Sequence, residues 1–229
     1  MSASFRSSKW FLVVAGLLLV LGAPGDALAK KKGKKGKNSS PKVELVGLQS
    51  MDGTFKQLRK LDNRVSSAEK EVNKSQRNLN TALGIKNDTP VKKGLQQLQK
   101  RAEGKVAVVT EGDVPKLKAT DAVPKNIENA INAVNTMATS FVASISDLET
   151  AKKDAEKLSK KVGKMPASVK DEFKKDSGSF FDVLFKLPKT MKAVNGNVQV
   201  ATSLPGRTTE VVATMTNIVG TITSTFSPL

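Results

Sequence analysis

The chain lacks cysteine, histidine and tyrosine, and its only tryptophan is Trp10. Without cysteine no disulfide can form, so packing alone must hold the fold together. Without histidine and cysteine the usual zinc and copper sites are excluded, together with the commonest general base and the thiol nucleophile of enzymes. We therefore expect a protein that is not an enzyme and that uses no metal and no cofactor.

The acidic residues indicate surface ion pairs rather than catalysis. Several carboxylates stand four residues before a lysine, the favourable order for pairs on a helix, among them those of Glu149 and Lys153, Glu156 and Lys160, and Asp171 and Lys175. The S-x-x-K pattern of penicillin-recognising enzymes occurs at Ser67–Lys70 and again at Ser39–Lys42, but its companion motifs S-D-N and K-T-G are absent. We identify no catalytic residue and no small-molecule substrate.

Residues 1–29 have the three-part pattern of a secretory signal peptide. Arg6 and Lys9 precede an apolar run from Trp10 to Leu21, and small residues at 27–29 provide the cleavage site. The run is too short to span a bilayer, which takes ~20 apolar residues. We expect cleavage after Ala29 and export to the periplasm or the cell exterior.

A lysine-rich tail at residues 30–40 follows the signal. Its sequence begins KKKGKKGK, and the whole chain has a net charge of +17. Repulsion between like charges and the freedom of glycine predict disorder. The tail is either a polyanion-binding element, with anionic lipid or polysaccharide as the partner, or a solvated segment that keeps the chain soluble. Nucleic acid is not expected, because no aromatic residue interleaves with the lysines, which are Lys30, Lys31, Lys32, Lys34, Lys35 and Lys37.

Two long amphipathic helices are predicted, at 41–83 and 124–163. In the first, apolar residues recur every seven positions, from Met51 through Leu58 to Leu79, with Thr54 and Ser75 as polar interruptions. The second repeats in the same way from Ile127 to Val162. Their similar length predicts an antiparallel pair.

Shorter elements are expected between and after these helices. A helix at 89–104 completes an N-terminal region of 41–104, and a linker follows at 105–123. The apolar run Val106–Val109 in this linker has the composition of a strand but no evident partner. The C-terminal bundle of 124–229 is predicted to contain a turn at Leu204-Pro205-Gly206 and a last helix carrying Val212 to Phe226.

Three stretches of the C-terminal region contain no charged residue, namely 129–146, 193–206 and 211–229. Because burial of unpaired charge is costly, the simplest prediction is that these stretches bury one another. The front half of the helix at 124–163 would then pack on the last helices.

The sequence therefore predicts an all-α fold: an elongated, antiparallel, coiled-coil-like bundle of five to six helices behind a disordered basic tail. The leading functional hypothesis is an exported binding or structural protein that engages an anionic envelope component. One alternative is a membrane-active protein that inserts its C-terminal helices. Another is a self-associating coiled coil in which Thr54 and Ser75 face a partner chain. The lipid-facing or partner-facing residues would be Phe180, Phe181, Phe185, Val219, Ile222 and Phe226.

Overall fold

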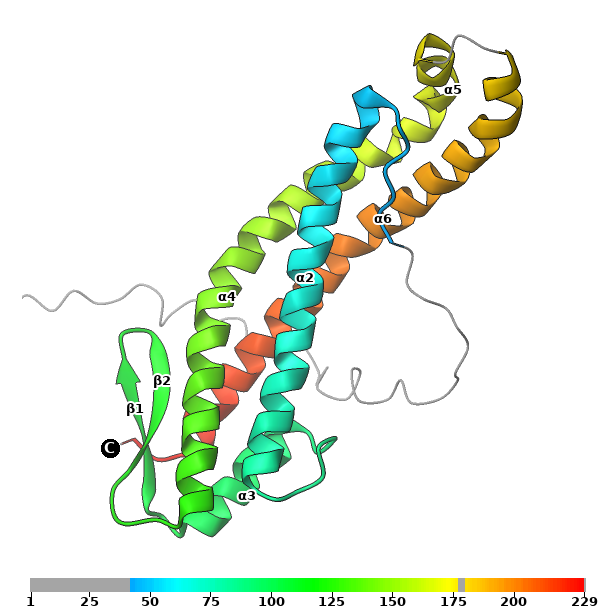
Figure 1. Ribbon diagram of the computed structural model, residues 1–229. Coiled ribbons are helices and arrows are strands. Elements are labelled where there is room, and N and C mark those ends of the chain that lie inside the picture. Colours follow the sequence, from blue (N-terminus) through cyan, green and yellow to red (C-terminus); the bar gives the residue numbers. More distant parts are fainter. Residues whose placement is uncertain (1–41, 177–179, 229) are drawn as a thin grey trace, which may run out of the picture. The chain divides into compact units, whose positions relative to one another are not determined.

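The computed structural model describes residues 42–176 and 180–228, which fall in one compact unit, Gly36–Leu229. The mostly helical fold predicted from the sequence is confirmed, although the described chain is not all-α (Figure 1). Its elements are α2 (Gln49–Ala82), α3 (Val91–Ala102), β1 (Val106–Glu111), β2 (Val114–Ala119), α4 (Lys125–Gly163), α5 (Met165–Asp176) and α6 (Phe180–Thr225).

The three long helices α2, α4 and α6 all pack on one another. Figure 1 shows α2 and α6 running in one direction and α4 in the other. The contact between α4 and α6 is the most extensive in the fold, and it joins the helices that carry the charge-free stretches. The stretch 193–206 and most of 211–229 follow one another along the single helix α6, so the predicted packing of these two on each other is wrong. The side chains that these stretches bury include Val134, Met137, Phe141, Leu204 and Met215.

The seven-residue stripe of α2 lies in the core, as its periodicity predicts. Met51, Leu58 and Leu79 are buried together with the polar interruptions, Thr54 being 3% and Ser75 5% exposed. The partners of this face are α4 and α6 of the same chain. The stripe therefore packs against helices of the same chain, and no second copy of the chain is needed to cover it.

The start of the first helix was predicted wrongly, because α2 begins at Gln49 rather than at residue 41. Gly47 has a φ of +78°, which interrupts a helix and favours glycine. The amides of Val46 and Gly47 donate to the Asp52 carboxylate at 2.8 and 3.1 Å. Arg59 donates to the carbonyl of Val43 at 2.9 and 3.2 Å. Side chains thus satisfy the backbone groups that a longer helix would have used.

Asn197 fastens the same N-terminal segment to α6. Its amide nitrogen donates to the carbonyl of Glu44 at 2.7 Å, and its oxygen accepts from the Glu44 amide at 2.8 Å. Asn197 is fully buried, so both hydrogen bonds are needed to compensate the loss of water. Lys42–Leu48 therefore has a fixed path along the helices before α2 begins.

The linker predicted at 105–123 folds into an antiparallel β-hairpin, which corrects the expectation of an unpartnered strand. Strand β1 pairs with β2, with Val108 opposite Leu117. The two-residue loop contains Gly112, whose φ of +63° suits the first position of a tight hairpin turn, followed by Asp113. Pro115 made β2 difficult to recognise as a strand in the sequence. The backbone nitrogen of Pro115 lies on the outer edge of β2, where the missing N–H costs no ladder hydrogen bond.

Both edges of the hairpin are occupied. On the outer side of β2, Asn135 of α4 accepts from the Leu117 amide at 2.6 Å and donates to the Leu117 carbonyl at 2.9 Å. On the outer side of β1, the amide of Val108 donates to the carbonyl of Ser227 at 2.9 Å. The two-stranded sheet therefore depends on α4 and on the chain's end, since an isolated hairpin is marginally stable.

Helix α6 continues through Pro188 and Pro205, so the predicted turn at 204–206 is wrong. A proline inside a helix removes a hydrogen bond and costs roughly 3 kcal/mol. Here Leu204 and Thr208 are completely buried on either side of Pro205. An interruption of α6 at Pro205 would pull these buried side chains apart. We therefore attribute the continuity of the helix to their packing.

Replacement of Asn135 tests how the hairpin is held. We expect Asn135→Ala to lower the free energy of unfolding by about 2 kcal/mol, because it leaves the Leu117 amide and carbonyl without partners. The control is Asn132→Ala, an exposed position on the same helix, where the same gain in helix propensity applies. Urea denaturation of Lys30–Leu229 measures both, and equal stabilities would contradict the role of Asn135.

Candidate functional site

The lysines predicted to bind a polyanion, Lys30 to Lys37, lie outside the described residues. So do the side chains of Phe180 and Phe181, although both residues belong to α6. Phe185, in the second turn of α6, is 68% exposed. It is the single large apolar side chain more than half exposed in the described part of the chain.

The other residues predicted to face lipid or a partner lie near the C-terminus and are turned inward. Ile222 is 0% and Phe226 4% exposed, and Val219 is half-buried against the core. Within 42–176 and 180–228, none of the helices combines the length and apolar character that crossing a membrane requires. The predicted set therefore does not form one surface.

The last turns of α4 carry a basic hollow that we had not predicted. It is open, has a volume of about 490 Å³ and is lined by Lys157, Lys160, Lys161, Lys164 and, across the turn, Met165 and Ser168. The spacing of the lysines places them on one side of α4, and all four are exposed. In the described part of the chain, none of them forms an ion pair.

An acidic residue of the neighbouring α5 is already paired. Glu172 accepts from Lys175 at 3.3 Å, and this pair replaces the one predicted between Asp171 and Lys175. Hydrogen bonding from Ser50 and then from Lys175 lowers the pKa of Glu172. Glu172 is therefore charged at neutral pH and directed to partners other than the hollow.

A second hollow, of about 270 Å³, lies where β1 meets the end of α3 and the C-terminal residues. None of its lining side chains is titratable. Its polar side chains are neutral amide and hydroxyl groups, those of Gln99, Thr120 and Ser227. The hollow thus offers no charged group for acid–base chemistry or for binding an ion.

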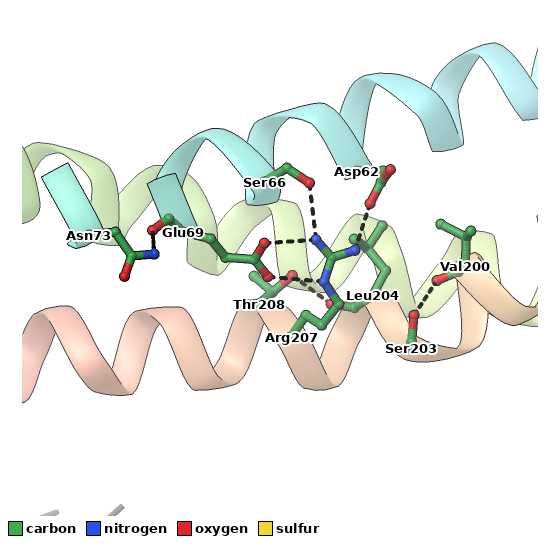
Figure 2. A network of polar contacts seen from close by, with 9 residues as sticks. All are labelled: Asp62, Ser66, Glu69, Asn73, Val200, Ser203, Leu204, Arg207 and Thr208. Carbon is green, nitrogen blue, oxygen red and sulfur yellow. Dashed lines mark hydrogen bonds and ion pairs between the residues drawn. The ribbon is translucent and has the colours of Figure 1, made fainter. Parts of the chain in front are cut away.

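Arg207 is the centre of a polar network between α6 and α2 (Figure 2). Its guanidinium donates to both carboxylate oxygens of Glu69 at 3.0 Å, to Asp62 at 2.6 Å and to the Ser66 hydroxyl at 3.0 Å. The bond to Glu69 has the two-pronged geometry that arginine forms and lysine does not.

The electrostatics of this network are those of a structural link. Hydrogen bonding to Glu69, followed by that to Asp62, raises the pKa of Arg207 against the opposing effect of desolvation. Two carboxylates face one guanidinium, and the side chains are only 19–35% exposed. Every hydrogen bond of the guanidinium is directed to α2, so the network holds two helices together rather than presenting a reactive group.

The sequence contained a signal for this network that we missed. Arg207 stands between the charge-free stretches 193–206 and 211–229. A lone arginine between two buried stretches needs a partly buried carboxylate partner. Nothing in the sequence, however, indicated that Asp62 and Glu69 would provide it, because they are more than 130 residues away in the chain.

No group of three or more aspartate, glutamate, histidine or cysteine side chains in the described chain could hold a metal ion. Comparisons of the chain with protein-family models, with curated proteins and with solved structures find no match. The candidate site is accordingly defined by geometry alone, and the basic hollow at the end of α4 is its main feature.

Removal of the Arg207 guanidinium tests the link between α2 and α6. We expect Arg207→Met to lower the free energy of unfolding by about 2 kcal/mol, less than the roughly 3–5 kcal/mol of a fully buried pair, because the network keeps some solvent contact. Arg207→Lys should lose part of this, since lysine cannot make the two-pronged bond.

The matched control is Arg64→Met, on α2. Arg64 pairs with Asp147 at 2.9 Å, but the side chains are 43% and 70% exposed, so its loss should cost at most about 0.5 kcal/mol. Thermal and urea unfolding of the three variants give the comparison. Equal losses for Arg207→Met and Arg64→Met would show that burial adds nothing to the Arg207 network.

Proposed function

We propose that this protein is an exported, non-enzymatic helical-bundle protein that binds an anionic component of the cell envelope. The lysine tail at 30–37 and the basic surface of the helical body would bind together. The signal peptide, the periplasmic or extracellular location and the antiparallel, coiled-coil-like arrangement are parts of this proposal. They rest on the N-terminal pattern and on the heptad spacing.

The basic hollow at the end of α4 is the observation that supports the proposal most directly. Lys157, Lys160, Lys161 and Lys164 share one side of the helix and, within the described residues, have no carboxylate partner. Like charges at this spacing repel, at a cost of a few tenths of a kcal/mol per pair. A bound anion relieves that repulsion, and each lysine near an anionic surface contributes ~1 kcal/mol of attraction.

The distribution of reactive groups supports a non-enzymatic role. The hollows at the end of α4 and beside β1 are lined by lysines in one case and by neutral side chains in the other. Lysine serves as a general base where burial in a cleft removes it from water, whereas the four lysines of the open hollow are exposed. The ionised groups that do cluster in a partly buried place, around Arg207, are bonded to one another.

The burial of the C-terminal residues and of the α2 stripe favours anion binding over membrane insertion and over self-association. Insertion of the C-terminal helix would require Ile222 and Phe226 to leave the core, where both are buried. Self-association through the α2 stripe would require Thr54 and Ser75 to be available, but both are buried within the chain. Binding through exposed lysines requires no rearrangement.

Vesicle co-sedimentation tests the proposed function. We expect Lys30–Leu229 to bind anionic vesicles or immobilised anionic polysaccharide at low ionic strength and to dissociate at about 0.5 M salt, where the Debye length falls below ~5 Å. Replacing the six lysines at 30–37 by glutamine should weaken binding at least tenfold, whereas replacing them by arginine should preserve it.

The glutamine and arginine variants have the same length, so charge is the main difference between them. Circular dichroism and unfolding midpoints establish that both keep the helical body. Absence of binding to any anionic surface at low salt would refute the proposed function, as would equal binding to neutral and anionic surfaces.

A further inference from the structure

We infer that the anionic component is a lipid bilayer, and that the protein meets it with the last turns of α4, with α5 and with the first turns of α6, Phe185 entering between the headgroups. This inference rests on the proposed function and names its partner. It adds a second contact surface, on the folded body, to the lysine tail.

The first turns of α6 present an apolar anchor flanked by cations. Phe185, Pro188, Lys189 and Lys192 follow one another at offsets of three, four and seven residues, so they share one face of the helix. All four are exposed. One exposed face of α6 thus presents an aromatic ring together with two ammonium groups, which can reach anionic headgroups while the ring leaves water.

The orientation of this face is fixed by the packing of α6. Thr190 and Val194 are buried, and Val183 packs half-buried against the core. These residues lie on the side of the helix opposite Phe185. Phe185 therefore cannot turn inward without removing Val194 from the core, and its exposure is a property of the fold.

The basic hollow belongs to the same end of the body. Helix α5 follows α4 directly and contacts both α4 and α6, and Figure 1 shows the end of α4, α5 and the start of α6 together. Residues 157–192 contain ten lysines and four acidic residues. One of these acids, Glu172, is paired with Lys175. The end that exposes Phe185 is thus also strongly cationic.

A bilayer explains both features, whereas a soluble polyanion explains only one. Lysines alone suffice to bind an anionic polymer by charge, and such a polymer gains nothing from an exposed phenyl ring. At a bilayer the ring leaves water for the acyl boundary while the lysines extend their charged ends to the headgroups. The coincidence of Phe185 with the cationic end therefore favours lipid as the source of negative charge.

Tryptophan replacement gives a direct readout of insertion. The only natural tryptophan is Trp10, so Phe185→Trp in the chain Lys30–Leu229 contains a single indole. We expect its fluorescence to shift to shorter wavelength with vesicles of 30 mol% phosphatidylserine in phosphatidylcholine, as the indole leaves water, and to stay unchanged with dextran sulfate. Leu45→Trp, at another exposed large apolar residue of the described chain, is the control and should not shift.

Binding affinities provide the second arm of the experiment. Phe185→Ser should weaken partition into anionic vesicles about tenfold, which corresponds to ~1.4 kcal/mol, and should leave binding to dextran sulfate unchanged. Leu45→Ser should alter neither. Replacing the four lysines of the hollow by glutamine should weaken vesicle binding about a hundredfold while the tail is intact.

The outcomes separate this inference from the proposed function. If Phe185→Trp does not shift and Phe185→Ser binds vesicles like the unaltered chain, while tail-dependent anion binding persists, the inference is wrong and the proposed function stands. If neither vesicles nor dextran sulfate are bound, both fail. Because Phe185 is exposed, these variants should keep the unaltered unfolding midpoint, which checks that the fold is intact.

Discussion

The contact between α4 and α6 is the interaction on which the rest of the structure depends. Both helices contribute stretches without charge, so their side chains pack closely without desolvating an ion. The chain has no cysteine, so packing holds the fold without any disulfide. The α2 stripe then covers the remaining apolar face of this pair. The remaining elements are attached to these helices.

Polar side chains make those attachments. Asn197 and Asn135 each present a donor and an acceptor to one backbone residue, and so hold the N-terminal segment and the β-hairpin against the helices. Arg207 does the same between α6 and α2 with two carboxylates. These three side chains form directional hydrogen bonds between different elements, and such bonds fix the register that apolar contacts leave open.

The two ends of α4 differ in the contacts that they make within the chain. Its first turns support the hairpin through Asn135, and its last turns present the lysines around Lys160 and lead into α5. The end bearing the hairpin is bonded within the chain. The end bearing the lysines and Phe185 has charge and apolar surface that the described chain leaves exposed. This asymmetry is the physical basis of the proposed binding function.

The sequence by itself determined the mostly helical class and the buried stripe of α2, and it indicated that the charge-free part of α4 packs on α6. Hydrophobic periodicity and the absence of charge can be read directly from neighbouring residues. It could not determine that Lys42–Leu48 is not helical or that Pro205 lies inside a helix, because the contacts of Asn197 and the packing of α6 involve residues distant in the chain. Strand β1 pairs with the neighbouring β2, but the hairpin is held by Asn135 and Ser227, which lie outside it. The same holds for the site. Tail lysines and Phe185 were recognised in the sequence by their residue type, but only the tertiary structure decided that Ile222 is buried in the core while Phe185 is exposed on the face of α6 that carries Lys189 and Lys192. Burial is set by what packs against a helix face.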